Sequence, residues 1–149
     1  MSRSRRTPSI ASTRDVRDTC LCLHTRRAAR ALARRFDAAL RPLGLTNGQF
    51  SLLMSINRRQ APTLGAIADT LGMDRTTLTA SLKPLARRRL VVVRSDASDR
   101  RIRRLALTGA GAGVLVAALP VWRREHAAIE RMLGRDPDRL RDDLRALGA

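Results

Sequence analysis

The stretch from Thr63 to Thr108 constrains the fold more than any other part of the chain. It opens with two short segments of helical apolar periodicity, residues 64–71 and 74–89, which are joined by a Gly-Met turn. A β-branched run, a turn of Asp and Ser residues and a second alternating run follow. Two helices joined by a short turn and followed by a β-hairpin form a winged helix-turn-helix.

Capping residues predict where these helices begin. Thr46 with Gln49 three residues later forms a capping box, so a helix is expected to start there. Asp74 is expected to cap the second helix of the helix-turn-helix by accepting a hydrogen bond from a first-turn amide. Pro84 lies inside that helix, where it removes one hydrogen bond and is expected to bend the helix late in its course.

The hairpin is predicted from two short runs. Val91–Val93 is β-branched and typical of a strand, and SDAS after it has turn chemistry. Over residues 101–108, Leu105 and Leu107 fall on one face and Arg104 and Ala106 on the other, which predicts a second strand paired with the first.

Helices are expected on both sides of this region, which makes the fold class mainly α with a small β-hairpin wing. Residues 1–13 read as a flexible basic arm, and 14–41 as one long helix ended by Pro42 and Gly44. A long helix follows Gly109, with a seam suited to packing against another helix: Leu115, Leu119, Trp122, His126, Ile129 and Leu133. Asp136-Pro137 opens a last helix.

The charge of the chain indicates a polyanionic partner. The formal net charge is +17, and its arginines concentrate in residues 1–35 and 87–104. Aromatic residues make up only 2% of the chain, whereas proteins that hold single-stranded nucleic acid stack bases on exposed aromatic rings. Duplex DNA is therefore the expected partner.

Several other classes are not supported by the sequence. It has no apolar run of 18 residues and no secretory signal, so no membrane segment and a cytoplasmic location are expected. The Gly109-Ala-Gly111-Ala-Gly113 run lacks phosphate-loop spacing and reads as the flexible start of a helix. With no nucleophile elbow and no paired acids, neither enzymatic activity nor a cofactor is expected.

Candidate DNA-contacting residues lie at the start of the second helix and on the wing. Arg75 can donate two hydrogen bonds to guanine, and the short threonines after it suit base edges, thymine methyls or phosphates. At the wing, an arginine in a narrow minor groove benefits from the negative potential there. The candidates are Arg75, Thr76, Thr77, Thr79, Lys83, Arg94, Asp99, Arg100, Arg101 and Arg103.

Two details of the wing are also expected. Asp99 is expected to hold Arg101 in an extended pose by a forked salt bridge. Arg94, Arg103 and Arg104 are expected to lie on phosphates. The alternatives are a threonine-rich capped turn without function and a solvated run of charges.

The chain resembles the MarR family of bacterial transcription regulators from about residue 15 to 148. The most specific match is D-x-x-D-R-R-x-x-x-L-x-L-T-x-x-G, which falls on Asp96, Asp99, Arg100, Arg101, Leu105, Leu107, Thr108 and Gly111. The chain departs from the family pattern at Ala80, where an arginine is frequent, and at Arg89, where glycine is usual.

The resemblance implies a homodimer joined by the first helix and the last two helices. It therefore implies dimerisation helices in 14–45 and 109–149, around a winged helix-turn-helix DNA-binding region in 46–108. The near-neutral C-terminal third agrees, because it carries more apolar stripe than one small domain needs. Two-fold symmetry predicts a palindromic operator. Family members are mostly repressors released by small aromatic or phenolic ligands, or by oxidants.

Cys20, Cys22 and His24 form a C-x-C-x-H run with three open interpretations. On a helix, Cys20 and His24 would share a face and Cys22 would point away, so no internal disulfide is expected. The cysteines either pack at the dimer interface or sense oxidants beside neighbouring arginines. The third interpretation is a metal site formed by Cys20, His24 and His126. The ligands are too few at standard spacing for a metal centre, so none is expected.

These features predict a sequence-specific, double-stranded DNA-binding transcription regulator. It is expected to be a ligand- or oxidant-responsive repressor that binds a palindromic operator as a homodimer. The alternative is a sequence-indifferent nucleoid-type DNA-binding protein that uses charge alone.

Overall fold

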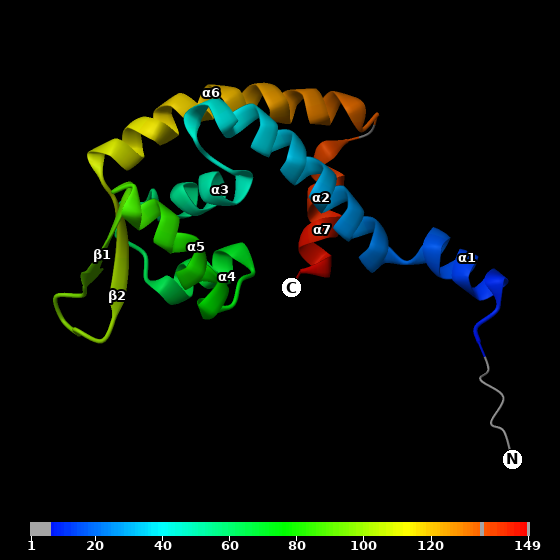
Figure 1. Cartoon of the computed structure of the whole chain (residues 1–149), viewed down its shortest axis with the longest axis horizontal. Helices are drawn as coiled ribbons and strands as arrows, with labels where there is room; N and C mark the ends of the chain where they lie inside the picture. The colour runs from blue at the N-terminus through cyan, green and yellow to red at the C-terminus, as the bar shows by residue number, and fades with distance from the viewer. Residues whose placement is uncertain (1–6, 135, 149) are drawn as a thin grey trace, which may run out of the picture. The chain divides into compact units, whose positions relative to one another are not determined.

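The fold is mainly helical with one β-hairpin, as the sequence predicts (Figure 1). The computed structural model describes residues 7–134 and 136–148. The chain divides between Arg34 and Arg35 into an N-terminal and a C-terminal unit. In chain order the elements are α1 (Ile10–Thr19), α2 (Leu21–Leu40), η1 (Arg41–Leu43), α3 (Asn47–Ile56), α4 (Leu64–Leu71), α5 (Arg75–Arg87), β1 (Val91–Ser95), β2 (Arg103–Leu107), α6 (Gly109–Met132) and α7 (Pro137–Leu147).

The core of the C-terminal unit joins the helix-turn-helix to the hairpin. Apolar residues from every element between the end of α2 and the middle of α6 meet there. Burial of each leucine or isoleucine side chain contributes about 1.5–3 kcal/mol, so the winged helix is held mainly by this cluster. Its largest fully buried members are Leu40, Leu52, Leu53, Ile67, Leu78, Leu85 and Leu105.

The predicted helix starts are confirmed by their capping geometry. Thr46 and Gln49 form a reciprocal capping box at the start of α3. Asp74 accepts the amide N–H of Thr77 at 2.8 Å and so caps α5. Pro84 lies inside α5, and the helix continues past it to Arg87. These local signals fix the direction in which α5 leaves the turn.

The hairpin is antiparallel, with strand pairing from Val91↔Leu107 to Ser95↔Arg103. The first strand is longer than the predicted 91–93, and the second is shorter than 101–108. The second strand begins only at Arg103 because the loop closes before it, where the amide of Asp96 donates to the carbonyl of Ile102 at 2.9 Å. Arg101 therefore belongs to the loop at the wing tip.

The N-terminal unit differs from the single helix predicted over residues 14–41. The helix is interrupted at Cys20, whose backbone is extended with φ −70° and ψ 106°. The α1 helix also begins earlier than expected, because Ser9 caps it by accepting the amide of Ser12. Of the arm predicted for residues 1–13, residues 1–6 lie outside the described residues and Ile10 to Thr13 are helical.

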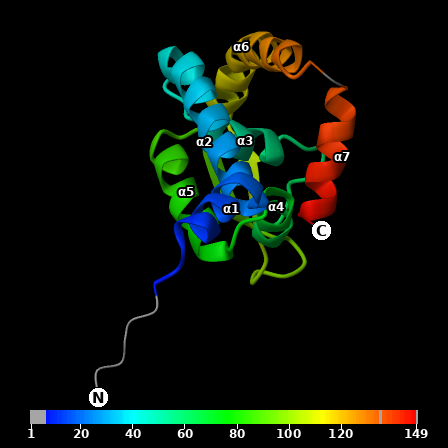
Figure 2. The same cartoon turned by 90° about the vertical axis from the view of Figure 1, so that its right-hand side faces the viewer.

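The last two helices begin where the sequence predicts. Thr108 caps α6, and Pro120 lies within it without ending it. Of the predicted seam, Leu115 is buried and the side chains from Leu119 to Leu133 are half-buried. Asp136 caps α7, with Pro137 as its first residue, and Figure 2 shows α7 continuing from the end of α6. Within residues 7–134 and 136–148, no helix is long and apolar enough to cross a membrane.

The turn after α5 contains a backbone conformation that disfavours its side chain. Arg89 has φ +55°, in the left-handed region. Its amide donates to the carbonyl of Ala86 and the amide of Leu90 donates to the carbonyl of Leu85, which is the helix-ending motif that glycine favours. Arg89 thus occupies, with strain, the left-handed position that glycine favours at the end of a helix.

Replacing Arg89 with glycine is expected to stabilise the protein. The left-handed conformation costs a side-chain-bearing residue about 1–2 kcal/mol, and the greater freedom of glycine in the unfolded chain offsets part of that gain. A net increase of up to about 1 kcal/mol in the free energy of unfolding is therefore expected from urea titration. Arg87→Gly, the same change within α5, should instead destabilise by about 0.5–1 kcal/mol. Equal destabilisation by both variants would contradict the strain.

Candidate nucleic-acid interface

The α5 helix presents its first turns to solvent. Arg75, Thr76, Thr77, Thr79 and Lys83 are all exposed, whereas Leu78 and Leu82 face the core. The helix is thus anchored along one side and free along the other. Such a helix can enter the major groove with its N-terminal turns toward the bases.

Hydroxyl hydrogen bonds organise the exposed face of α5. The Thr77 hydroxyl donates to Asp74 at 2.6 Å, and the Thr79 hydroxyl donates to the carbonyl of Arg75 at 2.7 Å. The Ser81 hydroxyl donates to the carbonyl of Thr77 at 2.9 Å. The bonds from the Thr77 hydroxyl and amide lower the pKa of the Asp74 carboxyl, which keeps this cap ionised. The threonine rotamers are therefore set before any ligand arrives.

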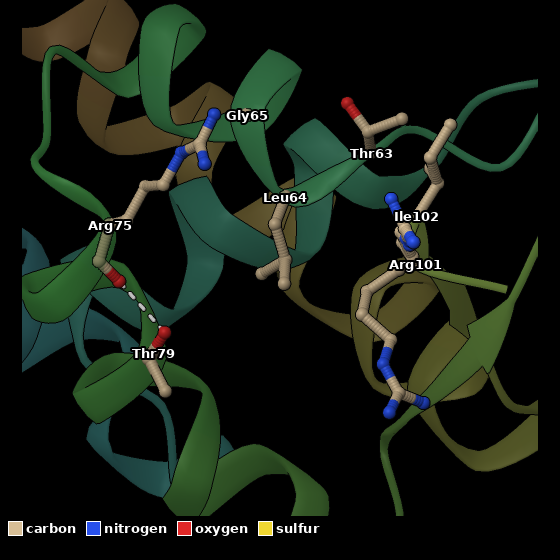
Figure 3. Close-up of a pocket in the computed structure, with 8 residues that line it drawn as sticks. Thr63, Leu64, Gly65, Arg75, Thr79, Arg101 and Ile102 are labelled. Atoms are coloured by element: carbon tan, nitrogen blue, oxygen red, sulfur yellow. Dashed lines mark hydrogen bonds between the residues drawn. The ribbon is translucent and has the colours of Figure 1, made fainter. Parts of the chain in front are cut away.

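Arg75 lies against the start of α4. A Cβ atom added at Gly65 would come within 3.5 Å of Nη2 of Arg75, so the guanidinium packs over a position that carries no side chain. Figure 3 shows Arg75 and Arg101 on either side of Leu64. Both arginines line one groove of about 440 Å³ between α5 and the wing. Thr63, Leu64, Gly65, Thr79, Ile102 and Arg103 complete its lining.

The wing loop is folded around the carboxylate of Asp96. Its Oδ1 accepts the Ser98 amide at 2.8 Å, the Ser98 hydroxyl at 2.5 Å and the Asp99 amide at 3.3 Å. Its Oδ2 accepts Nε of Arg104. The hydrogen bonds from Ser98, followed by that from Arg104, hold the pKa of the Asp96 carboxyl well below its usual range. Asp96 therefore stays ionised and organises the loop at any pH near neutrality.

Two sequence expectations about the wing are wrong. Asp99 does not form a fork with the Arg101 guanidinium among the described residues; its Oδ1 accepts the backbone amide of Arg101 at 2.9 Å. That hydrogen bond ties the Asp99 carboxylate to the loop backbone and not to the guanidinium. Arg104 is not free for a phosphate, since its guanidinium donates to Asp96 and to the carbonyl of Ala61.

The remaining candidate arginines carry uncompensated charge. Within the described part of the chain, Arg75, Arg94, Arg100, Arg101 and Arg103 have no ion-pair partner. The guanidinium of Arg103 donates to the hydroxyl of Ser95 at 3.2 Å. All five are exposed. Of these, Arg75, Arg101 and Arg103 line one groove, where a phosphate backbone would meet their charge.

The cysteines lie at the break between α1 and α2. Cys20 is half-buried and Cys22 is exposed. The expectation that Cys20 and His24 share a helical face is wrong, because Cys20 lies outside both helices. Its sulfur accepts the amide of Leu23 at 3.4 Å, and Nε2 of His24 lies 3.1 Å from the carbonyl of Asp18. The described residues contain no cluster of three or more potential metal ligands.

A second cavity lies between α3 and α6. It measures about 310 Å³ and is lined by Phe50, Ser51, Met54, Ser55, Leu71, Leu119 and Trp122. The Trp122 ring stacks on Phe50 at 6.3 Å and on His126 at 4.6 Å between centroids. The seam residues Trp122 and His126 thus form part of a stacked aromatic group.

The roles of two residues of the interface were not predicted from the sequence. Gly65 makes room for Arg75, and Arg104 joins Asp96 to the loop before α4. Both act through partners that are distant in sequence, so local periodicity carried no signal for them. The D-x-x-D spacing did contain Asp96, and its clustered hydrogen bonds show what that residue does.

Comparisons with known proteins place these features in a wider group. The family model that matches is that of the MarR family, over residues 43–102. A search of curated proteins gives no match. The chain is similar to the M. tuberculosis transcriptional regulator MosR in complex with DNA, with 43% identity over 87% of this chain and 93% of that chain and a TM-score of 0.79.

Two structures of another regulator are also similar. The transcriptional repressor CouR bound to a 23-mer DNA duplex is 30% identical over 90% of this chain and 96% of its own, with a TM-score of 0.80. CouR from Rhodococcus jostii RHA1 bound to p-coumaroyl-CoA is 25% identical over 88% and 93%, with a TM-score of 0.72.

Proposed function

The chain belongs to the MarR family of winged-helix transcription regulators, and we propose that it regulates transcription by binding one palindromic operator in duplex DNA. The observation that carries the proposal is the groove that Arg75 and Arg101 line together. One arginine comes from the helix that fits the major groove, and the other from the wing that fits the adjacent minor groove. The DNA complexes of MosR and CouR support the same partner.

The proposed contacts divide by chemistry. Arg75 reads guanine through its fork of donors, while Thr76, Thr77 and Thr79 lie against neighbouring base edges. Lys83, Arg94, Arg100 and Arg103 neutralise phosphates, and Arg101 enters the minor groove. Asp99 acts indirectly, because its carboxylate orients the backbone at Arg101.

We further propose that the regulator is a homodimer, because α6 and α7 expose apolar side chains that the described residues leave uncovered. Val116 is 73% exposed, Met132 74% and Leu147 62%. Among the described residues of α7, none is buried. A second copy of the chain would cover these faces, and the dimer interface would be formed by residues 14–45 and 109–149 of both copies. Two-fold symmetry then places the half-sites about 34–36 Å apart.

The DNA-binding proposal is tested by selecting bound duplexes from a random DNA pool. The expected result is one palindrome, bound roughly 10³-fold or more tightly than unrelated duplexes. A sequence-indifferent nucleoid-type binder would return no consensus and would show only a steep salt dependence. Recovery of no consensus would therefore refute the proposal of a sequence-specific regulator and favour that alternative. A cytoplasmic location and the absence of enzymatic activity belong to the same proposal.

We propose a small aromatic or phenolic effector for the cavity beside Trp122. Its apolar lining, stacked rings and volume of about 310 Å³ suit a single aromatic ring. The complex of CouR with p-coumaroyl-CoA supports an effector of this class. An oxidant is the second candidate, and the exposure of Cys22 beside the half-buried Cys20 favours it.

An effector screen is expected to separate these two candidates. Trp122 is the single tryptophan of the chain, so phenolic acids that enter the cavity should quench its fluorescence and release the operator. Ser51→Phe, which fills part of the cavity without adding a second tryptophan, should abolish the quenching. Peroxide should act instead through Cys20 and Cys22, and their replacement by serine should remove its effect. Quenching that survives in Ser51→Phe would exclude the cavity as the site.

A further inference from the structure

We propose that Arg104 is a positioning residue for the wing, which acts through Asp96 and holds the tip that carries Arg101 at a fixed place against the helix-turn-helix. The effect of Arg104 on operator binding rests on the proposed function, whereas its effect on the position of the wing tip does not. It begins from the weakness of the wing itself. A two-stranded ribbon is marginally stable in water unless other elements hold it.

The backbone attachment of the wing is short. The amide of Leu105 donates to the carbonyl of Pro62 at 2.9 Å, and Thr63 forms an isolated bridge with Arg104. These contacts hold β2 at one place near its middle. They leave the loop from Asp96 to Ile102 without backbone support from the helices among the described residues. The tip therefore needs a side chain to fix its angle.

Arg104 supplies that connection. Its Nη1 donates to the carbonyl of Ala61 at 2.8 Å, in the loop before α4, and its Nε donates to the carboxylate of Asp96 at the start of the tip. One planar guanidinium thus joins two segments far apart in sequence. Arginine is suited to this because its donors have a fixed geometry. The Asp96 side chain is only 11% exposed, so water competes weakly for it.

The connection continues from Asp96 to Arg101. The other oxygen of Asp96 accepts the amides of Ser98 and Asp99, and the carboxylate of Asp99 in turn accepts the amide of Arg101. Each bond fixes the next turn of the loop. The position of Arg101 is therefore set by a continuous chain of hydrogen bonds that starts at Ala61. The guanidinium of Arg104 is engaged in this series of hydrogen bonds and is not proposed to contact a phosphate.

The structural part is tested on the free protein with trypsin. Cleavage after Arg100 and Arg101 requires the tip to open, and loss of a charge-assisted hydrogen bond should speed it about fivefold in Arg104→Leu and Asp96→Asn. Arg94→Leu is the matched control, since Arg94 pairs in register with Arg104 but has no ion-pair partner among the described residues. It should be cleaved at the wild-type rate. Wild-type rates in both test variants would overturn the proposal.

The functional part is tested by a double-mutant cycle on the duplex selected by the wild-type protein. Arg104→Leu should weaken binding roughly 3- to 10-fold in the wild-type background and less than about twofold in the Arg101→Ala background, because it acts through Arg101. Arg94→Leu should weaken binding in both backgrounds. An equal loss from Arg104→Leu in both would mean a direct contact and would overturn the proposal. If no duplex is selected, the proposal of a sequence-specific regulator is wrong. The trypsin result still decides whether Arg104 holds the wing tip in place.

Discussion

Replacing Gly111 with alanine is expected to destabilise the protein by about 3 kcal/mol or more. A Cβ atom at this position would lie 2.0 Å from the carbonyl oxygen of Leu90. That oxygen cannot move away easily, because it accepts the amide of Thr108 at 3.1 Å and helps to set the start of α6. The clash is between the added Cβ atom, whose position is fixed by the backbone, and a backbone oxygen, so no side-chain rotation relieves it. Thermal unfolding at fixed protein concentration should show Tm lowered by roughly 10 °C.

Gly113→Ala is the matched control for this prediction. Gly113 lies two residues further along α6, and an added Cβ there meets nothing within 4 Å. The substitution should stabilise the helix by about 0.5–1 kcal/mol, since alanine favours helix and glycine does not. If Gly111→Ala were tolerated as well as Gly113→Ala, the close approach of α6 to the start of β1 would be wrong.

Replacing Arg101 with alanine is expected to weaken operator binding by about 1–3 kcal/mol, which is roughly 5- to 150-fold in Kd. The side chain is exposed, has no ion-pair partner among the described residues and lines the groove opposite Arg75. In each subunit its loss removes a minor-groove contact and one neutralised charge, so the salt slope of the proposed dimer should also fall by about 1.8. Titration of the selected duplex at several salt concentrations measures both effects.

Arg139→Ala removes the same charge from α7 and serves as the control. Arg139 is exposed and lies far from the wing in sequence, in the near-neutral C-terminal third. Its replacement should change Kd by less than about twofold. Equal losses from Arg101→Ala and Arg139→Ala would refute the placement of the wing in the interface and would favour binding by overall charge.

The parts of the fold that the sequence predicted are those governed by local chemistry. The Thr46 and Gln49 capping box, the Asp74 cap and the Asp136-Pro137 start each depend on residues within one helical turn. The same holds for the alternation that placed Leu105 toward the core. The winged helix and the exposed start of α5 can therefore be predicted from the sequence.

The parts that sequence reasoning missed depend on contacts between distant segments. Three glycines in alternate positions at the start of α6 look alike, yet only Gly111 approaches Leu90 closely. The positively charged side chain of Arg104 resembles its neighbours in the sequence, but its partners are Asp96 and the Ala61 carbonyl. The helix break at Cys20 was likewise not predicted, because no proline or glycine lies next to it in the sequence.

The hydroxyl groups along α5 have a consequence for which bases the helix would prefer. The hydrogens of Thr77, Thr79 and Ser81 all point back into the protein, so these side chains offer only oxygen lone pairs and, for the threonines, methyl groups outward. Such a surface complements the exocyclic amines of adenine and cytosine and the methyl of thymine, whereas Arg75 alone complements guanine. The pattern this arrangement favours is a half-site with a guanine opposite Arg75, next to base pairs that present an adenine or cytosine amine or a thymine methyl to the hydroxyl side chains.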